Sequence, residues 1–425
     1  MTGIAESIGL TNAELTRFFF VVVLLLASSH FFGHLFTRWR LPRVIGEIFG
    51  GFLLGSTVLG YFLPTVYGWL FNAFETEGKL LSIIYWFGLI LLMFVSGFEI
   101  QKTISGEDKK IIFAVILGST IIPFFVGWLA PSFYNFSPYI GSKNNYLALT
   151  IVIAIAAAVT AIPVISKIFI DLDILDTRFA KIVLAAATVH DCILWAGVAV
   201  ATGLVSTQKV SILRILITVL LTFAFFVIAL FVMPKIMRFS NSLKYNFLIK
   251  SSPVGYVLFV CFLFSAVASI LNVNIVFGAF LAGIVVGLMP HEKFEREKNH
   301  IKKMSLAFFV PLYFAIVGLK LDLIHHFDFK FFIFFWLFAS TIETLGTLAA
   351  MKFIKQDWLS SFNLGVAMNT RGGVGIILAT VAFDLGIINE TFFVTLVLIA
   401  IMTTLMAGCW FSWVISKGWE LLKEG

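Results

Sequence analysis

The chain has 425 residues, of which 60% are apolar, 16% are aromatic and only 12% are charged. Soluble proteins carry about 25% charged residues, so this composition excludes a water-soluble enzyme or nucleic-acid-binding protein and indicates a protein embedded in a lipid bilayer. The net charge of +7 does not require a nucleic-acid partner, because a polytopic membrane protein collects Lys and Arg in its cytoplasmic loops.

Apolar runs alternate with short polar breaks from one end of the chain to the other. A membrane-spanning helix needs about 20 mostly apolar residues, and this criterion predicts an all-α protein with about thirteen spans. The three cysteines each lie in an apolar run without metal-binding spacing, so we expect no disulfide framework and no cofactor. The predicted spans are residues 17–36, 43–63, 79–98, 111–130, 145–170, 179–204, 212–232, 254–271, 273–289, 304–319, 330–354, 360–384 and 390–416.

Basic residues fall mainly on one side of the predicted membrane. The breaks after the odd-numbered spans, together with the C-terminal tail, carry 22 of the 30 Lys and Arg residues, and the opposite side carries seven. The positive-inside rule therefore predicts an external N-terminus and a cytoplasmic C-terminus. We expect residues 1–416 to form a transmembrane domain and residues 417–425 a short tail with no attached regulatory domain.

Two predicted spans carry helix-breaking residues near their centres. The fifth is interrupted at residues 160–163, which end in Pro163, and the twelfth at residues 369–373, which end in paired glycines. Proline removes a backbone donor, and glycine loosens the backbone. Because the two spans are seven apart, they enter the membrane from opposite sides, as in inverted-topology transporter repeats that bind cargo where the breaks meet. The alternative is an ordinary proline kink and a tolerated glycine pair.

Four ionisable residues share the predicted midplane of the membrane. Asp191 lies twelve residues into the sixth span, and Glu343 and Arg371 lie at similar depths, as does His190. A charged group facing lipid at that depth costs at least about 2.5 kcal/mol, so these residues are expected to face protein or a water-filled cavity. For Arg371 and Glu343, an internal ion pair that clamps two helices is an equally good interpretation.

Asp191 is the strongest functional candidate. Small residues at 185–188 let the sixth span approach a neighbour closely, which brings the carboxylate towards the break in the fifth span. There the Thr160 hydroxyl and free backbone carbonyls can complete an oxygen shell for a small cation. Such a carboxylate can hold either a proton or a metal ion, and that competition is the chemistry of exchange.

Six segments of the chain resemble, in order, motifs of the monovalent cation:proton antiporter superfamily. The resemblance is closest to the branch that contains glutathione-gated potassium efflux systems, bacterial sodium/proton antiporters and plant cation/proton exchangers. The matching segments are residues 41–55, 91–100, 159–165, 185–191, 308–314 with 317–319, and 368–372.

This resemblance implies that Asp191 is the ion- and proton-carrying aspartate and that Thr160 supplies a helix 5 ligand. It also implies a homodimer in which a core, about residues 145–204 and 360–416, slides against a scaffold. His190 replaces the usual Asp, Asn or Gln, and Glu343 replaces a frequent Lys or Arg. Several relatives place a glutamate at Gly375. A pair between His190 and Glu343 would restore the local charge balance.

The sequence therefore predicts a non-enzymatic, multi-pass transporter in a bacterial inner membrane that exchanges Na⁺ or K⁺ for H⁺ by alternating access. With His190 neutral, the midplane charges sum to −1, which favours one-for-one electroneutral exchange. Because histidine titrates near physiological pH, His190 could also gate ion binding. The alternatives are an organic-solute or anion symporter and a non-transporting sensor or permease-like component. The candidate ion- and proton-binding residues are Asp191, His190, Thr160 and Glu343, and the structural or charge-balancing residues at the crossed helices are Pro163, Asn369, Thr370 and Arg371.

Overall fold

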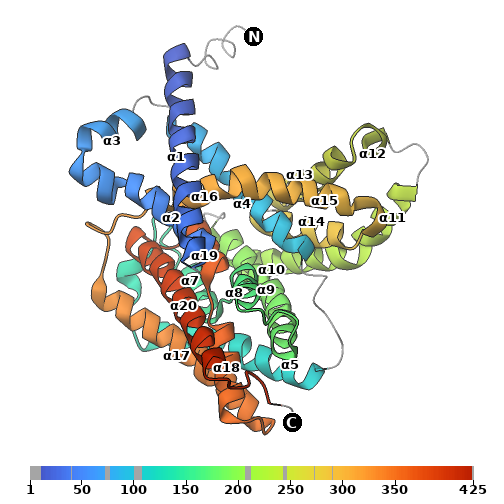
Figure 1. Ribbon diagram of the computed structural model, residues 1–425. Helices are drawn as coiled ribbons and strands as arrows, with labels where there is room; N and C mark the ends of the chain where they lie inside the picture. The colour runs from blue at the N-terminus through green and yellow to red at the C-terminus, as the bar shows by residue number, and fades with distance from the viewer. Residues whose placement is uncertain are drawn as a thin grey trace. The chain divides into compact units, whose positions relative to one another are not determined.

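The structure is a computed structural model, shown in Figure 1. Every regular element that it describes is helical, apart from one isolated β-bridge between Ile140 and Ile388. It describes residues 11–39, 41–71, 77–99, 108–205, 212–242, 247–271, 273–289 and 291–423.

The chain divides into two compact units, of which the first comprises Met1–Leu92 and Lys303–His325. At its centre three helices pack against one another: α1 (Asn12–Arg38), α2 (Arg43–Leu54) and α16 (Val310–Leu319), labelled in Figure 1. A side chain on Gly51 of α2 would overlap the backbone of Ala315 on α16, so glycine permits the close approach of these helices. The other helices of this unit are η1 (Ser56–Gly60), α3 (Pro64–Phe71), most of α4 (Glu77–Glu99) and η7 (Ser305–Phe309).

The second unit, Met93–Lys302 with His326–Gly425, contains all the candidate site residues. Helix α7 lies at its centre, packed against α6, α9, α17 and α19. The helices of this unit are α5 (Lys109–Ile116), η3 (Leu117–Ile121), α6 (Ile122–Leu129), η4 (Ala130–Ser132), η5 (Ser137–Tyr139), α7 (Tyr146–Ala158), α8 (Ile162–Asp171), α9 (Arg178–Val205), α10 (Ile212–Val227), η6 (Ile228–Val232), α11 (Met233–Ser242), α12 (Phe247–Ser251), α13 (Pro253–Ile270), α14 (Ile275–Gly287), α15 (His291–Met304), α17 (Phe329–Phe353), α18 (Trp358–Met368), α19 (Gly372–Asp384) and α20 (Glu390–Ser416).

Among the described residues, ten helices are long and apolar enough to cross a membrane, or eleven if the bent pair α18 and α19 is one span. The predicted count of thirteen is therefore not confirmed, although the all-α, multi-span architecture is. The predicted span 145–170 is divided into two shorter helices, and the predicted span 273–289 contains only the 13-residue helix α14. At 1.5 Å per residue, α14 is about 20 Å long, which is shorter than the hydrocarbon core.

Both predicted breaks are present, and they meet. Helix α7 ends at Ala158, the chain is extended at Val159, and α8 begins at Ile162 with Pro163 in its first turn, where proline is tolerated because its missing N–H would be unpaired anyway. Helix α18 ends at Met368 and α19 begins at Gly372, with a bend of 42° between them.

Backbone and side-chain hydrogen bonds join the two breaks directly. The Ala161 N–H donates to the Thr370 carbonyl at 2.6 Å, and the Thr160 hydroxyl donates to the Met368 carbonyl at 2.5 Å. The crossing is therefore held largely by backbone atoms, the Ala161 N–H and the Thr370 and Met368 carbonyls, that continuous helices would have bonded internally.

The Gly372→Ala variant tests this crossing, because Gly372 adopts a positive φ of 34° and an added Cβ would collide with the Val164 side chain. We expect a loss of about 1–3 kcal/mol in unfolding free energy, measured by thermal unfolding in detergent. Gly408→Ala on α20 is the matched control, since nothing lies within 4 Å of its Cβ position. Equal thermal stability of the two variants would contradict the predicted strain.

Candidate functional site

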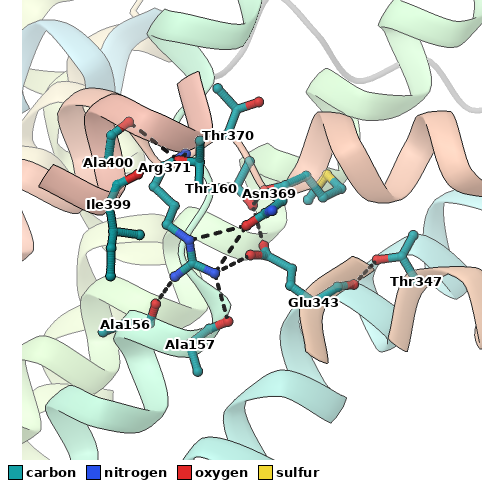
Figure 2. Close-up of polar contacts among 12 residues, drawn as sticks. Ala156, Ala157, Thr160, Glu343, Thr347, Asn369, Thr370, Arg371, Ile399 and Ala400 are labelled. Atoms are coloured by element: carbon teal, nitrogen blue, oxygen red, sulfur yellow. Dashed lines mark hydrogen bonds and ion pairs between the residues drawn. The ribbon is translucent and has the colours of Figure 1, made fainter. Parts of the chain in front are cut away.

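Arg371 lies at the crossing and points its guanidinium at the C-terminal end of α7, as Figure 2 shows. Nη1 donates to the Ala156 carbonyl, and Nη2 donates to the Ala157 carbonyl at 3.3 Å. The last carbonyls of a helix have no partner within the helix and carry the negative end of its dipole. Arg371 therefore supplies both hydrogen bonds and positive charge to the broken end of α7.

Glu343 on α17 is the counter-charge of Arg371. Its Oε2 accepts from Arg371 Nη2 at 2.8 Å, and the Thr160 hydroxyl oxygen lies 3.3 Å from its Oε1 (Figure 2). Asn369 adds a neutral acceptor, because its Oδ1 lies 3.2 Å from both Nε and Nη2 of Arg371. Glu343 is fully buried and Arg371 is 2% exposed. This is the internal ion pair that the sequence left open as one of two interpretations.

His190 does not pair with Glu343; both of its ring nitrogens have other partners. The Thr160 N–H donates to Nε2 at 3.0 Å, and the Thr120 hydroxyl lies 2.6 Å from Nδ1. The hypothesis of a His190–Glu343 pair is thus wrong for this structure, because Arg371 takes the carboxylate. An amide N–H can only donate, so Nε2 must be the unprotonated nitrogen. The ring is therefore neutral.

Asp191 follows His190 on α9 and is 3% exposed. Its Oδ1 is buried, and no described residue gives it a hydrogen bond. Within the described part of the chain, no three His, Cys, Asp or Glu side chains cluster as a metal site would require.

The structure brings the other predicted residues to the same crossing, with different contacts. Thr160 contributes its N–H and its hydroxyl to protein partners, so its role as an ion ligand stays a prediction. Thr370 contributes its carbonyl to the backbone bond between the breaks. The sequence reasoning missed Thr120, whose hydroxyl lies beside His190, and Thr403. The Thr403 hydroxyl accepts from the main-chain N–H of Arg371 at 3.4 Å. Their only signal was a hydroxyl inside an apolar run.

A groove of about 720 Å³ lies beside the crossing, between α17, α18 and α20. Its walls are mostly apolar, and its polar lining includes Asn369 and Thr403. Asp191 does not line this groove, so the groove is not where we place the ion.

Comparisons with known proteins agree with one another. Residues 21–417 match the family model described as "Sodium/hydrogen exchanger, transmembrane". K(+)/H(+) antiporter 1 of Saccharomyces cerevisiae is 28% identical over 93% of this chain and 46% of its own length. The Na(+)/H(+)-K(+) antiporter GerN of Bacillus cereus is 26% identical over 92% of this chain and 94% of its own length. This chain thus spans about half the length of the yeast relative and nearly all of the Bacillus relative.

A similar fold occurs among solved structures. The sodium proton antiporter MjNhaP1 from Methanocaldococcus jannaschii aligns with a TM-score of 0.60 at 14% identity. The alignment covers 94% of this chain and 98% of that one, so the likeness extends over the whole fold.

Proposed function

Because this chain belongs to the family of transmembrane sodium/hydrogen exchangers, we propose that it exchanges Na⁺ or K⁺ for H⁺ across the membrane by alternating access. It is an integral, multi-pass membrane protein. The names of its relatives in yeast and Bacillus support a monovalent cation and a proton as its two cargoes.

The observation that carries this proposal is the difference between Asp191 and the other buried carboxylates. Glu47 lies 2.8 Å from Arg43, and Glu343 lies 2.8 Å from Arg371. Asp191 has no such ion pair among the described residues, and one of its oxygens has no hydrogen bond. A buried carboxylate without a partner is costly unless a proton or a cation neutralises it. Asp191 is therefore suited to hold the two alternately.

Arg371 and Glu343 take fixed roles in this mechanism. Arg371 occupies the carbonyl end of α7 that a cation could otherwise use, and Glu343 neutralises Arg371. With His190 neutral, only the charge of Asp191 remains to be balanced. One proton or one monovalent cation does this, so we propose one-for-one, electroneutral exchange.

The experiment uses the purified full chain in proteoliposomes with a pH-sensitive dye inside. Addition of Na⁺ or K⁺ should drive proton movement, and the apparent KM for the cation should fall as pH rises, because fewer protons compete for Asp191. With Na⁺ as cargo, an imposed membrane potential should leave the rate unchanged. A potential-dependent rate would contradict the one-for-one ratio. A sensor, or a symporter for organic solutes, would give no proton signal with salts alone.

The wider assembly is also a proposal. We propose a homodimer in which a core, about residues 145–204 and 360–416, moves against the rest of the chain, which acts as the scaffold. The charge asymmetry of the loops supports an external N-terminus and a cytoplasmic C-terminus. We place the protein in a bacterial inner membrane.

A further inference from the structure

Thr120 belongs to a π-helical turn in the middle of a membrane-spanning helix. This span runs from Lys109 to Ser132, and its turn at Leu117–Ile121 is π-helical. A π turn inserts an extra residue into a helix and is frequent at functional sites. Next to it, Gly118 packs so closely on α17 that an added Cβ would lie 2.5 Å from Thr347 Cα. The turn thus packs against α17 at Gly118 and places the Thr120 hydroxyl beside His190 on α9.

The hydrogen-bond directions in this network are fixed by the backbone. The Thr160 N–H can only donate, so it requires an unprotonated Nε2 on His190. The single hydrogen of a neutral ring then stands on Nδ1, and the Thr120 hydroxyl at 2.6 Å must accept it. In the other tautomer, two donors, Nε2–H and the Thr160 N–H, would face each other. Thr120, Thr160 and His190 are all fully buried, so no solvent compensates for a lost partner.

We propose that Thr120 is a positioning residue for the ion site, and that by accepting the Nδ1 hydrogen it holds the His190 ring in the orientation that binds the Thr160 backbone. Without the Thr120 hydroxyl, the Nδ1 hydrogen would be buried without a partner. The ring would then rotate towards another acceptor for that hydrogen, which weakens the hydrogen bond from the Thr160 N–H to Nε2. The bond to Thr160 fixes the break after α7 against α9, one residue from Asp191. The expected effect on transport rests on the proposed function, but the position of the hydrogen on His190 does not.

The Thr120→Val variant tests the transport effect, because valine has nearly the shape of threonine and no hydroxyl. One lost hydrogen bond of about 1.4 kcal/mol corresponds to a tenfold change, so we expect the apparent KM for the cation to rise about tenfold. Thr120→Ser keeps the hydroxyl and should stay within about twofold of the unmodified protein. Thr347→Val is the matched control: its hydroxyl is also fully buried but donates only to the Glu343 main-chain carbonyl.

Nitrogen-15 NMR of labelled histidine in lipid reads the tautomer directly, with the His190 signals assigned by their loss in His190→Gln. The unmodified protein should show hydrogen on Nδ1 with the chemical shift of a hydrogen-bonded N–H, and Thr120→Val should move the Nδ1 signal towards that of an N–H without an acceptor. Hydrogen on Nε2 in the unmodified protein, or a Thr120→Val KM equal to that of Thr347→Val, would overturn the inference. If the Nδ1 hydrogen responds to Thr120→Val but the unmodified protein exchanges no cations for protons, the proposed function is refuted and the role of Thr120 at His190 stands.

Discussion

Asp191→Asn is expected to abolish cation-driven proton movement in proteoliposomes, down to the rate of protein-free vesicles. The amide has nearly the shape of the carboxylate but can neither bind a proton nor offer a negative charge to a cation. Oδ1 of Asp191 has no hydrogen bond to any described residue, so no bond at that atom is lost. Removal of a buried, unpaired charge should leave thermal stability unchanged or raised.

Glu47→Gln is the matched control for this variant. Glu47 is also a buried carboxylate within a span, at 3% exposure, but it is paired with Arg43. We expect Glu47→Gln to retain exchange, which would show that loss of a buried charge is not in itself sufficient to stop transport. Exchange by Asp191→Asn at the rate of the unmodified protein would refute the assignment of Asp191.

The breaks could be predicted from the sequence because proline and glycine act locally. Pro163 cannot continue the ladder of hydrogen bonds in α7, and Gly372 adopts a backbone conformation that other residues avoid. The midplane residues could be predicted for a similar reason, since a charge is rare and costly inside an apolar run. Both effects act within one segment, whichever helices are its neighbours.

The partners of these residues could not be predicted in the same way. Whether Glu343 bonds to His190 or to Arg371 depends on side-chain reach and on the register of α9, α17 and the α18–α19 break. None of these is encoded in one local segment. Thr120 was missed because a threonine in an apolar helix commonly bonds its own backbone, as Thr347 does. The helix count is not confirmed because two predicted spans are divided at their breaks and a third contains only the 13-residue helix α14, which the length of an apolar run does not reveal.

Arg371→Gln is expected to destabilise the protein more than Gly372→Ala does. It leaves Glu343 fully buried without its counter-charge and removes two donors from the carbonyl end of α7. Loss of one partner of a buried ion pair typically costs about 3–5 kcal/mol. Thermal unfolding in detergent should show this loss. Arg178→Gln is the control, because the pair Arg178–Asp108 is 2.7 Å long but Arg178 is 44% exposed, and exposed pairs contribute at most about 1 kcal/mol.

The double variant Glu343→Gln with Arg371→Gln separates two contributions to the unfolding free energy: the cost of leaving one buried charge unpaired and the stabilisation by the ion pair itself. If the pair is fixed and neutral, as proposed, the double variant should be more stable than Arg371→Gln alone, because no buried charge is left unbalanced. Its loss should also be smaller than the sum of the two single losses by at least about 1 kcal/mol, as expected for residues in contact. Additive losses would mean that the two side chains do not act as a pair in the membrane. Glu343 would then be available to carry a cation or a proton, and the exchange ratio would have to be measured again.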